Sequence, residues 1–196
     1  MPFIRTIPPA EAQGLVREMY QRIEKQQGMI PNWAHVFALR PGVQQQWAAF
    51  LGSIRSNMSV RGYELATLAA ARALCSTYCS MAHGSVLAEQ VFDPAAVTAI
   101  MRDSREAPLE AGERAMMAFV DKMIRNADQI TAADVESLRS HGYTDEEIFD
   151  VAAAAAARCF FSKLLDALGV QADAKYNDID SAMRDVLTVG RPVAAH

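Results

Sequence analysis

The sequence has few cysteines, no long apolar run and no basic stretch. Its three cysteines are too few and too oddly numbered for the disulfide framework of a secreted domain, so we expect free thiols in a cytoplasmic setting. No run approaches the roughly 18 apolar residues of a membrane span. The N-terminus lacks a basic region followed by an apolar core, so we expect no signal peptide. With a net charge of −4 and scattered basic residues, the composition indicates no nucleic-acid partner.

The 196 residues instead carry a helical pattern. Apolar residues recur at three- and four-residue spacing between the prolines, and no run alternates as a strand would. The pattern predicts an all-α fold, a compact helical bundle, with residues 1–196 forming a single domain. The helices are expected over 11–27, 43–54, 60–74, 78–90, 93–102, 110–126, 131–140 and 145–168.

Cap residues support several of these boundaries. Ser59 precedes one helix, Asp93 stands before a proline suited to a first helical position, and Thr144 with Glu147 forms a plausible capping box. The stripe Val43, Trp47, Phe50, Leu51 and Ile54 predicts a buried face. Trp33, Phe37 and Trp47 are expected in the core, with one of them at a pocket mouth as the alternative. The tail after Gly190 is expected to fray.

The segment 144–170 shows a faint likeness to the segment 59–90. When Glu64 is set against Glu147, Ser76 aligns with Cys159, Cys79 with Ser162, and His83 with Asp166. Two repeated helical halves would explain this match. The alternative is that alanine-rich helices look alike by composition.

Reactive side chains gather in the segment 59–90. Cys79 and His83 are four residues apart, so on a helix they share one face. If Ser76 caps that helix, Cys79 is its third residue, where free backbone N–H groups and the positive end of the helix dipole favour a thiolate. His83 can then exchange a proton with the sulfur. Small neighbours (Ser80, Ala82, Gly84) leave room for another backbone or a substrate.

This spacing resembles that of the alkylhydroperoxidase D and carboxymuconolactone decarboxylase superfamily, whose members are all-helical oligomers. Its redox members carry a glutamate, a cysteine twelve residues later, a second cysteine three further on, and a histidine four after that. Counting from Glu64 gives Ser76, Cys79 and His83, with Tyr78 a familiar residue before the second cysteine. A looser likeness, to an uncharacterised peroxidase-related branch, covers 31–54 and 146–176, with FALRPGVQQQW and KLLDALGV.

The resemblance implies a peroxiredoxin-like enzyme that reduces an organic hydroperoxide. Cys79 would attack the peroxide, and Glu64 and His83 would relay the proton. The family's first cysteine, which resolves the oxidised one, is replaced by Ser76. Cys75 is one residue away but four from Cys79, and on an intact helix that spacing is too wide for a disulfide. Three other ways to reduce oxidised Cys79 remain: Cys75 after local unwinding before the cap, Cys159 on the second alanine-rich helix, or an external thiol.

Two other functions remain open from the sequence. The decarboxylase branch acts on a small carboxylated lactone, with the histidine and glutamate as general acid and base. A helical oligomer without catalysis is the other, in which Cys79 is a buried packing residue, His83 a structural one, and Glu64 a first-turn acid. In every case we expect a homo-oligomer with no cofactor and no metal, since His35 and His141 lack partners at metal-ligand spacing.

Overall fold

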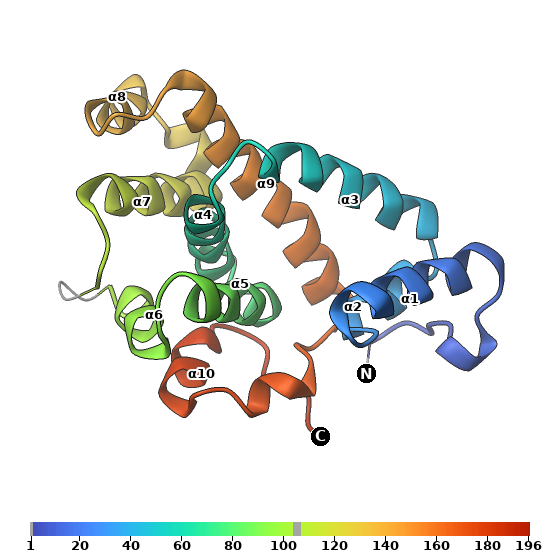
Figure 1. Ribbon diagram of the computed structural model, residues 1–196. Coiled ribbons are helices and arrows are strands. Elements are labelled where there is room, and N and C mark those ends of the chain that lie inside the picture. Colours follow the sequence, from blue (N-terminus) through green and yellow to red (C-terminus); the bar gives the residue numbers. More distant parts are fainter. Residues whose placement is uncertain (1, 104–106) are drawn as a thin grey trace.

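The computed structural model describes residues 2–103 and 107–196, and these contain helices and loops without a strand. The all-α prediction is therefore confirmed for the described chain (Figure 1). The α-helices are α1 (Gly14–Gln27), α2 (Asn32–Phe37), α3 (Pro41–Arg55), α4 (Val60–Ala73), α5 (Thr77–Gln90), α6 (Pro94–Met101), α7 (Ala111–Asn126), α8 (Ala132–Ser140), α9 (Asp145–Ala167) and α10 (Ser181–Leu187). Short 3-10 turns lie at Pro9–Glu11, Ala127–Gln129 and Ala174–Asn177.

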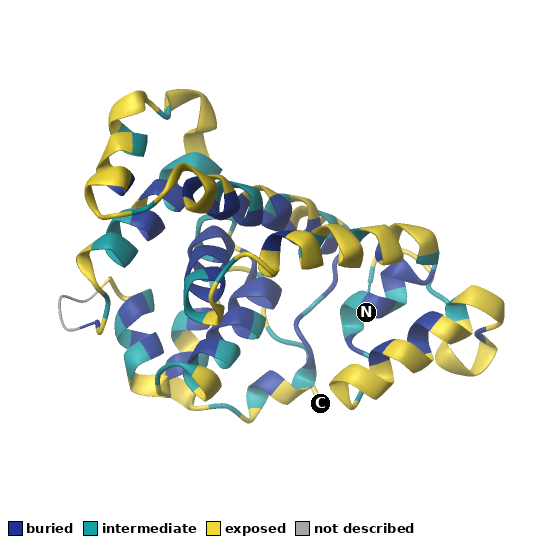
Figure 2. Cartoon of the chain, turned by 45° about the horizontal axis from the view of Figure 1, so that its top comes forward, coloured by how far each residue is buried: buried dark blue, intermediate teal, exposed yellow. Residues whose placement is uncertain are grey.

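The core is built around α4 and α5. Every residue of α4 from Tyr63 to Ala71 is buried, and α4 contacts α5, α7 and α9. A helix that is apolar on all sides needs neighbours on all sides, and its alanines let those neighbours approach closely. Helix α9 runs diagonally through the molecule and also contacts α3, while α10 packs under α5 and α6 (Figure 1). Figure 2 shows the buried residues concentrated in these central helices.

The predicted caps are present. Ser59 Oγ accepts from the backbone N–H of Gly62 at 3.0 Å, and Asp93 Oδ1 accepts from that of Ala96 at 2.7 Å. Thr144 and Glu147 form the expected capping box at the start of α9. Local sequence therefore predicts the first residues of α4, α6 and α9 to within one or two residues.

Three expectations about the chain ends and short helices were wrong. The first helix begins at Gly14, after a separate 3-10 turn, rather than near Glu11. Helices α2 and α10 were not predicted at all, because six and seven residues carry little periodic signal. The tail after Gly190 is held in place: the backbone N–H of Ala194 donates to the carbonyl of Ala172 at 2.9 Å.

The predicted buried stripe on α3 is also partly wrong. Ile54 is buried, but Val43 is 46% exposed and Phe50 is 52% exposed. Together with Phe160 on α9 they form an apolar surface that nothing in this single chain covers. The reason is that α3 lies at the edge of the bundle and packs mainly against one helix, α9 (Figure 2).

The two segments of the suggested repeat differ in local structure. The first breaks between α4 and α5, where Cys75 has a φ of 54°, whereas the aligned part of α9 runs without interruption from Asp145 to Ala167. No described helix combines the length and apolarity needed to cross a bilayer.

Candidate active site

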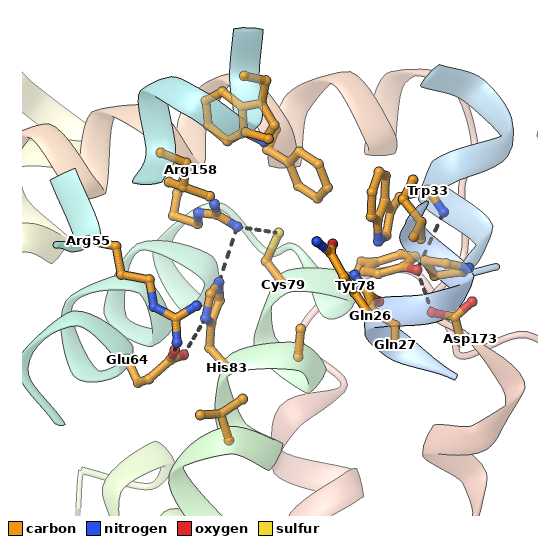
Figure 3. A pocket seen from close by; sticks show the side chains of 18 of the residues that line it. Gln26, Gln27, Trp33, Arg55, Glu64, Tyr78, Cys79, His83, Arg158 and Asp173 are labelled. Atoms are coloured by element: carbon orange, nitrogen blue, oxygen red, sulfur yellow. Dashed lines mark hydrogen bonds and ion pairs between the residues drawn. The ribbon is translucent and has the colours of Figure 1, made fainter. Parts of the chain in front are cut away.

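A cavity of about 410 Å³ lies where α1, α3, α4, α5 and α9 converge with the segment after α9. Glu64, His83 and Arg158 lie at one side of it and Tyr78 and Asp173 at the other, with Cys79 between them, and much of the remaining lining is apolar or aromatic (Figure 3). The lining includes Ile23, Gln26, Gln27, Pro31, Trp33, Gln44, Trp47, Ala48, Leu51, Arg55, Tyr63, Glu64, Tyr78, Cys79, Ala82, His83, Val86, Arg158, Phe161, Asp173, Lys175 and Tyr176. A concave, largely apolar pocket with a few converging polar groups is typical of a small-molecule site.

Cys79 is the third residue of α5, as predicted, with Ser76 at the N-cap position. The Ser76 side chain makes no capping hydrogen bond, so the cap itself differs from the expectation. Cys79 is 1% exposed, and its Sγ lies 3.1 Å from the Oγ of Ser162 and 4.0 Å from Nη1 of Arg158. The sulfur therefore faces a hydroxyl donor and a cation, both from α9, instead of a dry apolar interior.

Glu64 and His83 form the pair that the family resemblance implied. Oε2 of Glu64 lies 2.6 Å from Nδ1 of His83, and both side chains are buried. The Nε2 of His83 lies 3.1 Å from Nη1 of Arg158. Since a guanidinium only donates, Nε2 accepts and the ring proton sits on Nδ1, where it is donated to Glu64. Burial lowers the pKa of His83 below its usual 6.5, with Arg158 adding to the effect and the Glu64 hydrogen bond opposing it, so the ring is neutral at pH 7.

Arg158 connects the pair to the sulfur. It is 5% exposed, and its guanidinium lies over the rings of Phe161 and Trp47 at 5.3 Å and 5.7 Å from their centroids. Among the described residues its Nε has no hydrogen-bond partner. A second cation, Arg55, lies 3.8 Å from the other oxygen of Glu64 at the more exposed side (Figure 3). Arg55 thus pairs with Glu64 at the edge of the cluster, whereas the buried Arg158 contacts the neutral His83 ring, and an anion at the sulfur would balance the Arg158 charge.

Tyr78 lies at the other end of the cavity. Its hydroxyl donates to Oδ2 of the buried Asp173 at 2.5 Å and accepts from the backbone N–H of Trp33 at 3.4 Å. Burial, followed by the Asp173 charge, raises the pKa of Tyr78 well above 10. With a hydrogen bond donated and another accepted, this hydroxyl is a structural group that holds Tyr78 in position next to Cys79.

The other sequence candidates do not line the cavity. Cys75 is exposed at the break between α4 and α5, Cys159 is half-buried on α9, and all three cysteines are free thiols. Ser162, one turn after Cys159, is the α9 residue that meets Cys79. Of the small residues near the sulfur, Ala82 lines the cavity, whereas Gly84 accommodates Leu187: a Cβ there would lie 2.6 Å from Cδ2 of that leucine. The described residues contain no group of three side chains suited to a metal ion.

The sequence reasoning missed Arg158, Arg55 and Asp173 as parts of the site. Arg158 had one available signal, because it is the only charged residue between Asp150 and Lys163 in an otherwise apolar stretch. A lone charge inside a buried helix requires a partner. Trp33, Phe37 and Trp47 were expected in the core, with one at a pocket mouth as the alternative: Phe37 is buried in the core, and both tryptophans pack against the core and also line the cavity.

Solved structures resemble this one over nearly the whole chain. An uncharacterised peroxidase-related protein with an alkylhydroperoxidase AhpD core, from Ralstonia eutropha, is 21% identical with a TM-score of 0.78, over 97% of this chain and 98% of that one. A peroxidase-related protein from Silicibacter sp. is 24% identical with a TM-score of 0.75, over 90% and 92%. A variant of the debrominase Bmp8 in complex with 2,3,4-tribromopyrrole is 17% identical with a TM-score of 0.70, over 95% and 98%.

No protein-family model matches the sequence, and no curated protein matches it either. The likeness to solved structures thus establishes the fold. Those structures have different names, a peroxidase-related protein and a debrominase, so the fold alone does not identify a reaction. The chain has the fold of the alkylhydroperoxidase D-like proteins, as the spacing of Glu64, Cys79 and His83 predicted.

Proposed function

We propose that this protein is a thiol peroxidase that reduces an organic hydroperoxide with Cys79. The observation that carries the proposal is the position of the sulfur, in a cavity beside Ser162 and Arg158, with the Glu64–His83 pair behind the guanidinium (Figure 3). We place the enzyme in the cytoplasm and expect it to form a homo-oligomer.

The nucleophile is a thiolate, which the surroundings favour in two ways. The Arg158 cation attracts the negative sulfur, and the Ser162 hydroxyl donates to it. The proton of the thiol passes to Nε2 of His83 once the Arg158 hydrogen bond shifts from the ring to the sulfur. Glu64 then stabilises the imidazolium through Nδ1–H.

The reaction transfers one oxygen atom. The thiolate attacks the terminal oxygen of the hydroperoxide, an S–O bond forms, and the O–O bond breaks with its electron pair going to the alkoxide. Arg158 stabilises the charge that develops on the leaving oxygen, and the imidazolium of His83 returns the proton to it. The products are an alcohol and a sulfenic acid on Cys79, which is oxidised by two electrons.

We propose that an external thiol completes the cycle. Neither Cys75 nor Cys159 lines the cavity, and Ser76 carries no thiol. Two equivalents of a small thiol would reduce the sulfenic acid, giving the Cys79 thiol, water and a disulfide of the reductant.

The test is a Cys79→Ser variant assayed for loss of hydroperoxide in the presence of dithiothreitol, with Cys75→Ser as the matched control. We expect Cys79→Ser to have no turnover, because a hydroxyl cannot take up the peroxide oxygen, and Cys75→Ser to act like the wild type. Equal rates for both variants would refute the proposal.

The second candidate is a lyase of the carboxymuconolactone decarboxylase type. The observation in its favour is the buried Glu64–His83 pair, which needs no sulfur to act as general acid and base. A lyase would retain its activity on a small carboxylated lactone in Cys79→Ser and lose it in Glu64→Gln. If Cys79, His83 and Glu64 can be replaced together with no loss of any activity, the non-catalytic oligomer is the better description.

A further inference from the structure

Three aromatic side chains form one side of the cavity next to Cys79, and we call Trp33, Trp47 and Phe161 the aromatic wall. Trp47 and Phe161 are stacked, with ring centroids 5.8 Å apart and an interplanar angle of 14°. Trp33 meets Phe161 edge-on at 5.9 Å. Both tryptophans of the chain belong to this wall, and both are half-buried with surface toward the cavity.

The wall is held by a second set of hydrogen bonds, which we call the Asp173 clasp. Oδ1 of Asp173 accepts from the backbone N–H of Asn32 at 2.7 Å, and Oδ2 accepts from Tyr78 at 2.5 Å. The Tyr78 hydroxyl in turn accepts from the backbone N–H of Trp33. One buried carboxylate therefore ties the first turn of α2 to the residue directly before Cys79.

The clasp matters because the first turn of α2 has no side-chain cap of its own, although Ala34, Val36 and Phe37 later in the helix are buried in the core. The helix is six residues long, and the residue at its N-cap position, Pro31, supplies no side-chain cap. Its first backbone N–H groups require acceptors, and Asp173 and Tyr78 provide them from 141 and 45 residues away. Loss of the clasp would leave the N–H groups of this first turn without their acceptors, so the position of the Trp33 indole relative to the sulfur of Cys79 depends on the clasp.

Resting on the proposed peroxidase function, we propose that the aromatic wall selects hydroperoxides that carry a flat aryl group, and that Tyr78 and Asp173 are its positioning residues. A phenyl ring gains contacts with the two half-buried indoles, which the buried Phe161 ring supports from behind, while its peroxide group reaches Cys79 and Arg158. A compact alkyl hydroperoxide or hydrogen peroxide leaves most of a 410 Å³ cavity to water.

The kinetic test compares two substrates that differ by a phenyl in place of a methyl, cumene hydroperoxide and tert-butyl hydroperoxide. We expect the ratio of their kcat/KM values to be at least about ten in the wild type. Tyr78→Phe removes the hydroxyl and keeps the ring, and it should lower the ratio at least about three-fold, mainly through a higher KM for the aryl substrate. Tyr143→Phe, remote from the cavity, should leave the ratio at the wild-type value.

A comparison of two substitutions at Asp173 separates a positioning role from a general loss of structure. Asp173→Asn retains one carbonyl oxygen as an acceptor, so its ratio should lie between those of the wild type and Asp173→Ala. Equal ratios in Asp173→Asn, Asp173→Ala and the wild type would overturn the positioning role.

A binding measurement is independent of turnover. Because both tryptophans line the cavity, their fluorescence should change saturably with 2-phenyl-2-propanol, the alcohol product, and far less with tert-butanol. Aryl binding without hydroperoxide turnover would overturn the peroxidase and leave the aryl selectivity of the cavity standing. Turnover with no aryl preference and no saturable fluorescence change would overturn the selectivity and leave the peroxidase standing.

Discussion

The guanidinium of Arg158 should control the reactivity of Cys79, and Arg158→Met tests this. The methionine keeps a similar unbranched stem and removes the charge. Two unit charges 4.0 Å apart interact by about 4 kcal/mol at an effective dielectric constant of 20. Since about 1.36 kcal/mol of activation free energy corresponds to a factor of ten in rate, loss of this attraction could slow the attack of the sulfur by up to roughly 1,000-fold.

The assay is the rate of iodoacetamide alkylation at pH 7, measured in a background with Cys75→Ser and Cys159→Ser so that only one thiol reacts. We expect Arg158→Met to react at least about 10-fold more slowly, because no cation then stabilises the anionic sulfur that attacks the reagent. Arg158→Lys should lose less, since it keeps a charge without the planar fork. Arg55→Met is the matched control, because that guanidinium pairs with Glu64 and not with the sulfur.

Thermal unfolding by circular dichroism shows whether each variant is folded at the assay temperature. Alkylation of a folded Arg158→Met as fast as that of the wild type would refute the reasoning. Partial recovery of Arg158→Ala by added guanidinium would support it, because the cavity can admit a small cation from solvent.

Two further predictions concern stability. Because the folded-state pKa of His83 lies below 6.5, the unfolded chain takes up a proton on this ring first as the pH falls, so the contribution of His83 to stability is complete above pH 6.5 and is lost below it. In urea unfolding between pH 7.5 and 5, the free energy of unfolding should therefore fall less in His83→Gln than in the wild type. An equal fall in both proteins would contradict this. Thr144→Ala removes the acceptor for the Glu147 backbone N–H at the start of α9, which should lower the free energy of unfolding by about 1 kcal/mol and Tm by roughly 2–4 °C. The control is Glu146→Ala, at an exposed neighbour outside the capping box, which should shift Tm by much less. An equal shift in both variants would argue against the cap.

The sequence predicted most of the long helices because residues near their N-termini form local capping hydrogen bonds. Ser59, Asp93 and Thr144 each satisfy a backbone N–H within three residues, so the signal needs no tertiary contact. Burial of a face does depend on tertiary contacts. Val43 and Phe50 follow the same spacing as Ile54, and only the position of α9 decides which of them is covered.

The same distinction applies to the candidate site. Cys79 and His83 share one face of α5, so their spacing alone placed them together, and the family resemblance added Glu64 from the preceding helix. Arg158 and Ser162 reach the sulfur from 79 and 83 residues away, and Asp173 reaches Tyr78 from 95 residues away. No periodic pattern reports such pairings, because they depend on how α9 crosses the bundle.

The left-handed backbone at Cys75 has a consequence for how this chain can change. Only there, between α4 and α5, does the path turn so that a new helix opens two residues before Cys79. A residue with a side chain pays about 1 kcal/mol to adopt that conformation, and glycine does not. Replacement of this outward-facing thiol by glycine would therefore strengthen the turn, whereas any insertion in Leu74–Ser76 would rotate the sulfur of Cys79 away from Arg158.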